Sequence, residues 1–133
     1  MPMLSLSLTR SLDDATRLCV ARALTDLTAE LLHKKPALTA LSIRCVAPDH
    51  WYVGAEALTP ARTGLFLETR VSAGTNTKDE KSRYIAEVWH TLEELLGPLE
   101  PHSYIAVLEI DADAWGYEGQ TQEVRHVGAR LAG

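Results

Sequence analysis

The chain has 133 residues, of which 46% are hydrophobic and 23% charged, and its formal net charge is −5. The length fits one domain, residues 1–133, with a sizeable core. The negative charge argues against a nucleic-acid partner, because phosphate binding needs a basic face. No apolar run approaches the roughly 18 residues of a membrane span, and the start does not resemble a signal peptide. We therefore expect a cytoplasmic protein with no membrane contact.

The first half of the chain predicts a strand, a helix and a second strand. Leucine alternates with serine through residues 3–8, which indicates a half-buried strand. Ser11 is expected to cap a helix that runs to about His33, because acidic residues follow in the first turn. Apolar residues then alternate through 41–45, which indicates the second strand.

The second half repeats this order. Residues 64–71 alternate as a strand, and Thr77 to Glu80 form a capping box for a helix that stops at Gly97. Tyr104 to Ile110 form a last strand rich in β-formers. A shift of the chain by 64 residues places similar residues on one another: Leu24 on Val88, Leu31 on Leu95, Asp49 on Asp113 and Trp51 on Trp115. We interpret this as two β-α-β pseudo-repeats, about 2–54 and 64–119.

Two such units side by side predict an α+β fold with a four-stranded mixed sheet. Crossovers between parallel strands are right-handed, so both helices should cover the same face of the sheet. The other face would remain uncovered, and its apolar side chains need a partner. We therefore expect the chain to associate with further copies of itself.

The cysteines and two isolated histidines carry little functional signal. Cys19 and Cys45 have neither metal-type nor redox-type spacing, so we expect buried, reduced thiols rather than a disulfide. His50 and His102 also lack metal-ligand spacing, and we expect them at the surface. No metal and no organic cofactor is implied.

Pro2 directly follows Met1, and an initiator methionine is removed when the next residue is small. The mature chain would then begin with a proline whose nitrogen is a free secondary amine. A free α-amino group titrates near pH 8, and burial among apolar neighbours disfavours its charged form. Such an amine can be neutral at about pH 7, as a general base must be.

Three features together resemble the tautomerase superfamily: the Met-Pro start with its alternating strand, the stretch from Val20 to Asp26, and the segment from Glu109 to Tyr117. That superfamily includes 4-oxalocrotonate tautomerase (4-OT), macrophage migration inhibitory factor (MIF), chloroacrylic acid dehalogenases and malonate semialdehyde decarboxylase. The resemblance covers residues 2 to about 120. It implies a homotrimer in which Pro2 is the catalytic base and arginines bind a small carboxylate substrate.

Arg10, Arg44 and Arg70 are the candidates for that substrate-binding role. Arg10 lies at the far end of the first strand, about 26 Å from Pro2, so it can reach a proline only across a subunit boundary. Arg44 and Arg70 lie on the strand face that alternates away from the apolar side chains. Each of them can either line a pocket or pair with an acid.

Four aromatic residues gather in the two mirrored turns: Trp51, Tyr52, Trp115 and Tyr117. We prefer Trp115 and Tyr117 as a substrate-binding wall beside the proline, since apolar surroundings lower the pKa of an amine. The alternative is that these large side chains fill the core or an interface.

We therefore expect an isomerase that uses Pro2 as general base for keto–enol or double-bond isomerisation of a small 2-oxo or 2-hydroxydienoic carboxylate. One alternative is a dehalogenase, hydratase or decarboxylase of the same superfamily with protonated Pro2 as the acid. Another is a non-catalytic binding protein with the same fold. The cis-dehalogenases carry a histidine where this chain has Thr28, and an arginine pair where residues 71–76 have none. The stretch 35–40 also lacks the acid of the decarboxylase. These departures favour isomerisation, in which a proton moves within the substrate, over dehalogenation and decarboxylation.

Overall fold

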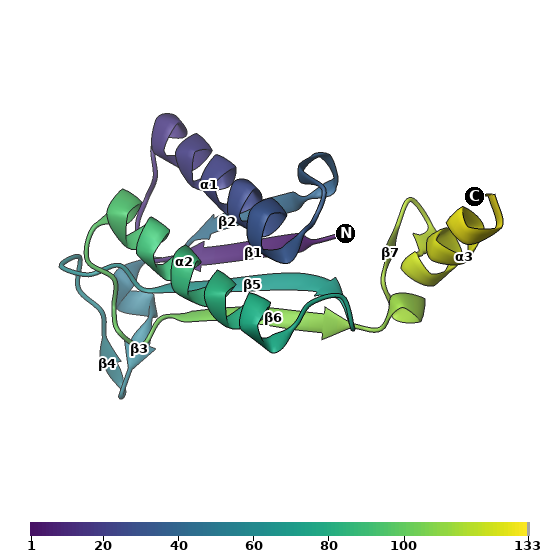
Figure 1. Ribbon diagram of the computed structural model, residues 1–133. Coiled ribbons are helices and arrows are strands. Elements are labelled where there is room, and N and C mark those ends of the chain that lie inside the picture. The colour runs from purple at the N-terminus through teal and green to yellow at the C-terminus, as the bar shows by residue number, and fades with distance from the viewer. Residues whose placement is uncertain (133) are drawn as a thin grey trace.

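The computed structural model describes residues 1–132, which form a four-stranded mixed sheet covered on one face by two long helices (Figure 1). The sheet has the strand order β2-β1-β5-β6. Its strands are β1 (Met3–Leu8), β2 (Ala40–Cys45), β5 (Leu65–Ser72) and β6 (Tyr104–Ile110), and its helices are α1 (Asp14–Leu32) and α2 (Lys78–Leu96). The predicted α+β fold, with both helices on one face of a mixed sheet, is confirmed.

The core lies between the sheet and the helices. Strands β1 and β2 pair in parallel, as do β5 and β6, and the two units meet at the antiparallel pair of β1 and β5. At the centre of the sheet, Leu6 lies opposite both Ile43 and Leu67. The alternation of leucine with polar residues places the leucines on the helix side, where burial stabilises each by roughly 1.5–3 kcal/mol. The fully buried leucines of the sheet are Leu4, Leu6, Leu8, Leu65 and Leu67.

The helix starts depend on side-chain caps. Thr77 and Glu80 form the predicted capping box at α2, with both reciprocal hydrogen bonds present. At α1 the predicted Ser11 cap is wrong. Asp13 is the cap, because its backbone is extended and its carboxylate accepts a hydrogen bond from the Thr16 amide at 2.7 Å. Asp13 is two residues nearer to the helix than Ser11, and an aspartate caps as well as a serine.

Shorter elements lie inside the first β-α-β unit, between α1 and β2, and after each of the two units. They are η1 (Pro36–Leu38), η2 (Pro48–His50), β3 (Tyr52–Val53), β4 (Glu56–Ala57), η3 (Ala112–Ala114), β7 (Gly116–Tyr117), β8 (Gln120–Thr121) and α3 (Gln122–Ala132). Helix α3 lies beyond the last predicted element. Figure 1 shows it standing off the end of the sheet, at the same end as the N-terminus. Among the elements described, α3 makes its main contacts with η3 and β8.

The cysteine prediction is half right. Cys19 and Cys45 are both free, but both are exposed rather than buried. Cys19 precedes Val20, which belongs to the buried stripe of α1, and so points to another side of that helix. Cys45 is the last residue of the edge strand β2. His50 and His102 are exposed, as predicted.

A polar network crosses the core where the two helices meet the sheet. The hydroxyl of the buried Tyr84 lies 2.9 Å from Thr28 Oγ1 and 3.0 Å from Thr69 Oγ1. Thr28 donates its own proton to the Leu24 carbonyl at 2.7 Å. Tyr84 therefore donates to Thr28 and accepts from Thr69, which satisfies all three hydroxyls and joins α1, α2 and β5. Burial raises the pKa of Tyr84, and its two threonine partners partly oppose this.

We expect Tyr84→Phe to lower the free energy of unfolding by about 1–3 kcal/mol, because the hydroxyls of Thr28 and Thr69 lose a buried partner. Urea unfolding followed by circular dichroism measures the change. Tyr52→Phe is the matched control, since Tyr52 is 63% exposed and lies outside the four-stranded sheet. Equal unfolding midpoints for the two variants would contradict the network.

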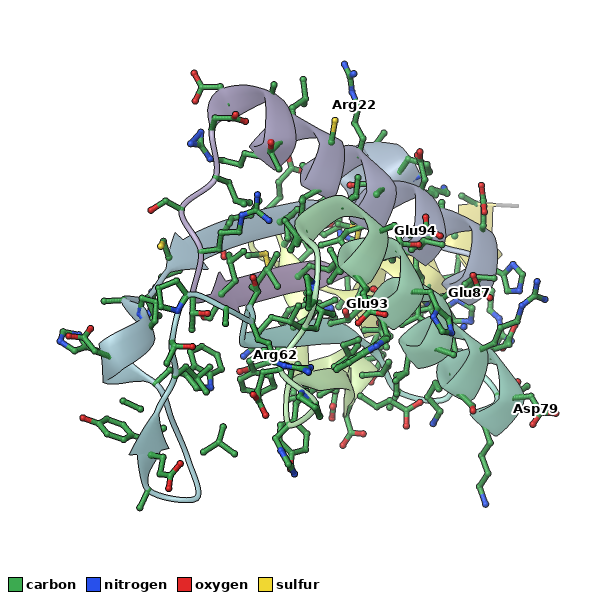
Figure 2. The ribbon with its side chains drawn as sticks, turned by 90° about the vertical axis from the view of Figure 1, so that its left-hand side faces the viewer. Arg22, Arg62, Asp79, Glu87, Glu93 and Glu94 are labelled. Carbon is green, nitrogen blue, oxygen red and sulfur yellow. The ribbon has the colours of Figure 1, made fainter. Side chains whose placement is uncertain are left out.

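The sheet face opposite the helices is open and partly apolar. Phe66 on β5 and Tyr104 on β6 are exposed there. Charged side chains cover the outer surfaces of the helices instead, and Figure 2 shows Arg22 of α1 and Asp79 of α2 projecting away from the body. Across residues 1–132, every helix is too short or too polar to cross a membrane.

Candidate active site

Pro2 is buried at the end of the sheet, immediately before β1. Its carbonyl accepts a hydrogen bond from the Ala40 amide at 3.1 Å, which extends the pairing of β1 with β2 and fixes the start of the chain. Pro2 lines an open cleft with a volume of about 1050 Å³. The other walls come from the end of α1, the loop between β5 and α2, the β7–β8 hairpin and α3. The chain start therefore lies in the wall of a cleft to which several separate segments contribute.

Trp115 contacts the chain start directly. Its indole nitrogen donates a hydrogen bond to the Met1 carbonyl oxygen at 2.8 Å, and this oxygen belongs to the amide that contains the Pro2 nitrogen. Trp115 follows η3, and the next residue, Gly116, begins the β7–β8 hairpin. A Cβ at Gly116 would lie 2.0 Å from the Gln120 carbonyl oxygen, so only glycine fits there. The structure therefore places Trp115 beside the chain start, and its role in substrate binding stays a prediction.

Tyr117 also lines the cleft, where it holds an arginine that sequence reasoning missed. The guanidinium of Arg125, on α3, lies 3.7 Å from the centre of the Tyr117 ring and donates to the Tyr117 carbonyl at 2.9 Å. Glu118 lies 3.6 Å from the same guanidinium but is largely exposed. The Nε of Arg125 is buried and has no hydrogen-bond partner within residues 1–132. Arg125 thus places a guanidinium at the cleft, with its Nε covered by the surrounding chain.

Lys34 is a second missed cation. It follows His33, which ends α1 in the left-handed conformation (φ 59°) and turns the chain toward the cleft. The Lys34 ammonium donates to Thr75 Oγ1 at 2.8 Å, across the cleft wall. Burial lowers the pKa of Lys34, while the charges of Glu80 and Glu109 act in the opposite direction.

The same surroundings act on the amine at the chain start. Burial, and secondly the positive charge of Lys34, lower the pKa of the Met1 amine below its usual range. An ammonium in a half-buried place loses hydration, and a nearby cation repels it. An amine held here is therefore neutral over a wider pH range than one in water.

The charge lining the cleft is opposite to that of the whole chain. Three cationic side chains line it, Lys34, Lys35 and Arg125, against one carboxylate, Glu123. His33 and His126 add two groups that become cationic when protonated. The cleft lining is thus more cationic than the chain of net charge −5 as a whole, while Glu118 and Glu80 pair with Arg125 and His33 from outside the lining.

None of the three arginines predicted from sequence lines the Pro2 cleft within one protomer. Arg10 lies at the opposite end of β1, where its guanidinium donates to the Leu96 carbonyl. Arg44 is exposed on β2, and its register places it beside Ser7. Arg70 forms an ion pair with Glu68 on the open sheet face. The position of Arg10 agrees with the expectation that it reaches a proline only across a subunit boundary.

The second half has a counterpart of the Pro2 position without its amine. Gly64 precedes β5 as Pro2 precedes β1, and its amide donates to Thr9 Oγ1 at 2.9 Å. Trp51 packs close to Gly64, since a Cβ added there would lie 3.5 Å from its ring. Trp51 thus occupies beside β5 the place that Trp115 occupies beside β1. The Gly64 nitrogen is an internal amide, so this position offers no base.

Metal-ligating side chains do not gather in this part of the molecule. Across residues 1–132, no three of His, Cys, Asp and Glu are arranged to hold a metal ion.

Solved structures with a similar fold identify the architecture. A fused 4-OT solved as an asymmetric trimer matches with a TM-score of 0.82 at 18% identity, over 92% of this chain and 98% of that one. Pt0534 inactivated by 2-oxo-3-pentynoate matches with a TM-score of 0.81 at 16% identity, over 92% and 98%. The chain has the tautomerase-superfamily fold. An MIF-like protein from Entamoeba histolytica also shares this fold, with a TM-score of 0.74 at 16% identity over 90% and 97%.

The tautomerase fold confirms the resemblance predicted from the Met-Pro start and the Asp-Ala-Trp-Gly-Tyr segment. Similarity in sequence is weaker, since no family model and no curated protein matches the chain significantly. At identities below 20%, these similarities establish the fold of this chain but not the reaction that it catalyses. The activity has to be argued from the residues of the cleft.

Proposed function

We propose that this protein is a tautomerase in which the Pro2 nitrogen is the general base. The reaction is keto–enol or double-bond isomerisation of a small 2-oxo or 2-hydroxydienoic carboxylate. The observation that carries the proposal is the burial of Pro2 in the wall of a cleft lined by cations. The proposal requires that Met1 is the initiator residue and is removed, because an amide nitrogen has no basicity.

The cleft provides the conditions for a neutral amine. Removal of Met1 transfers the α-amino group to Pro2, which is more deeply buried than Met1. Burial and the Lys34 charge, which lower the pKa of the Met1 amine, would act on the Pro2 amine in the same direction. A base whose pKa lies near or below the working pH is present in its proton-accepting form.

The substrate carboxylate is proposed to bind the cations of the cleft. The Lys34 ammonium is a point charge on one side, and Arg125 supplies a guanidinium on the other. Hydrogen bonds from such groups to a carboxylate are about twice as strong as neutral ones. Tyr117 lines the cleft beneath Arg125, and Trp115 contacts the chain start at the Met1 carbonyl.

The active form is proposed to be a homotrimer. Fused 4-OT structures with this fold are trimers, and the open sheet face of this chain exposes Phe66 and Tyr104. In such an assembly Arg10 of a neighbouring copy is the candidate that reaches the Pro2 cleft. Arg44 and Arg70 remain predictions for substrate binding, because both lie on the open face that the neighbours would cover.

Covalent labelling tests the proposed base. We expect 2-oxo-3-pentynoate, which inactivates the similar protein Pt0534, to add once to this chain. A neutral secondary amine is a strong nucleophile toward this electrophile, and tandem mass spectrometry should place the adduct on the Pro2 nitrogen. Turnover of phenylenolpyruvate and 2-hydroxymuconate should disappear as the adduct forms. Loss of turnover with the adduct on Lys34 instead would refute Pro2 as the base.

A further inference from the structure

The hydrogen bond between Trp115 and Met1 marks a position beside the Pro2 nitrogen. The indole N–H donates to the Met1 carbonyl oxygen at 2.8 Å. In a peptide unit the carbonyl oxygen lies about 2.2 Å from the amide nitrogen, since both are bonded to the same carbon. The donor is therefore aimed at a point next to the atom proposed as the base.

The Met1 carbonyl oxygen marks the position that an oxygen of the substrate could occupy once Met1 is removed. The Met1 carbonyl leaves with the initiator residue, and the half-buried indole N–H then loses its acceptor. A half-buried donor that has lost its partner can bond to water or to an oxygen bound beside Pro2, and a substrate oxygen that carries negative charge is the stronger acceptor. A substrate whose carbon approaches the Pro2 nitrogen carries its carbonyl or enol oxygen only one or two bonds away.

We propose that Trp115 is a catalytic residue that donates its indole N–H to the substrate oxygen on which negative charge develops. This rests on the proposed function and assigns to Trp115 a role beyond that of an apolar wall. Tryptophan can only donate a hydrogen bond, so it stabilises the oxyanion and never transfers a proton. A fixed donor aimed at developing charge is among the largest contributions to enzymatic rate.

The proton and electron balance needs no further reagent. The Pro2 nitrogen takes a proton from the carbon next to the substrate carbonyl. The C–H electron pair forms a carbon–carbon double bond, and the carbonyl π pair moves to oxygen, which accepts the hydrogen bond from Trp115. The ammonium of Pro2 then returns the proton to oxygen or to a distant carbon of the conjugated system. The indole keeps its proton throughout.

Trp51 provides a matched control within the same chain. It lies beside Gly64 as Trp115 lies beside Pro2, but the nitrogen there is an internal amide. A Trp→Phe change removes the indole N–H at either place and keeps an aromatic ring. Only the change beside the base should affect chemistry.

The kinetic test compares Trp115→Phe with Trp51→Phe in protein from which Met1 is shown by mass to be absent. We expect kcat of Trp115→Phe to fall about 10²-fold, with a smaller change in KM and the same pH profile, because an indole does not titrate. Trp51→Phe should keep kcat within about two-fold of the parent chain. Equal kcat values for the two variants, or a shifted pH profile in Trp115→Phe alone, would overturn the inference.

A second readout does not depend on turnover. Oxalate resembles an enolate of a 2-oxo acid, and the chain has three tryptophans whose indole N–H resonances are separately observable by NMR. Oxalate should shift the Trp115 resonance downfield and leave those of Trp51 and Trp89 in place, and Trp115→Phe should weaken oxalate binding about ten-fold. An unmoved Trp115 resonance with oxalate bound would overturn the inference. If oxalate shifts the Trp115 resonance but the protein shows no turnover, the oxygen site is supported and only the tautomerase proposal is contradicted.

Discussion

A chain that keeps Met1 should lose turnover by about 10²–10⁴-fold, the usual contribution of a general base. Insertion of a lysine between Met1 and Pro2 prevents removal of the initiator, because the second residue is then large. The Pro2 nitrogen stays an amide, and the carbonyl of the inserted lysine, now bonded to that nitrogen, takes the place of the Met1 carbonyl as the acceptor for Trp115. Steady-state kinetics with phenylenolpyruvate, together with the intact mass, measure the effect.

Pro2→Ala is the matched control for that experiment. Its processed chain still begins with an amine, although a primary one, so it should retain more activity than the extended chain. An unchanged melting temperature in both variants shows that the fold survives. If the extended chain, with Met1 present by mass, turns over at the rate of the parent, Pro2 is not the base.

Lys34→Gln should change both substrate binding and the pH profile. Loss of a charge-assisted hydrogen bond to the carboxylate is expected to raise KM about ten-fold or more. Lys34 lowers the pKa of the amine at the chain start, so its replacement should raise that pKa. The base accepts a proton only when neutral, above its pKa. The acidic limb of kcat/KM should therefore move to higher pH.

Arg22→Gln is the control for the charge effect, because it removes the same unit of charge from the outer surface of α1 (Figure 2). At ordinary ionic strength a distant exposed charge is screened, so Arg22→Gln should leave KM and the acidic limb unchanged. If both variants shift the limb equally, the effect reflects net charge and not the place of Lys34 in the cleft.

The sheet and the long helices could be predicted because their signals are local. Leucine alternates with serine through β1, and the Thr77–Glu80 capping box starts α2 as predicted. The order of elements then fixes which face the helices cover. Trp115 could be placed near Pro2 because it lies in a turn after the last strand, mirrored by Trp51 in the first half.

The cations of the cleft could not be predicted because they come from segments that meet only in the folded chain. Lys34 turns toward Pro2 after the left-handed His33, and Arg125 lies on α3, beyond the last predicted element. The sequence carries one weak signal for Lys34, a basic residue just after a helix C-terminus. For Arg125 the sequence offers only its position eight residues after Tyr117, whose carbonyl the guanidinium contacts in the folded chain.

The most direct measurement is the titration of the Pro2 amine itself. Protein labelled with ¹⁵N-proline and lacking Met1 is titrated by NMR in its folded state and again in urea, and Pro2→Ala assigns the resonance. A base buried beside Lys34 should show a lower pKa in the folded protein than in the unfolded chain. A folded pKa equal to or above the unfolded one, or a Pro2 nitrogen that does not titrate, would contradict proton abstraction by Pro2.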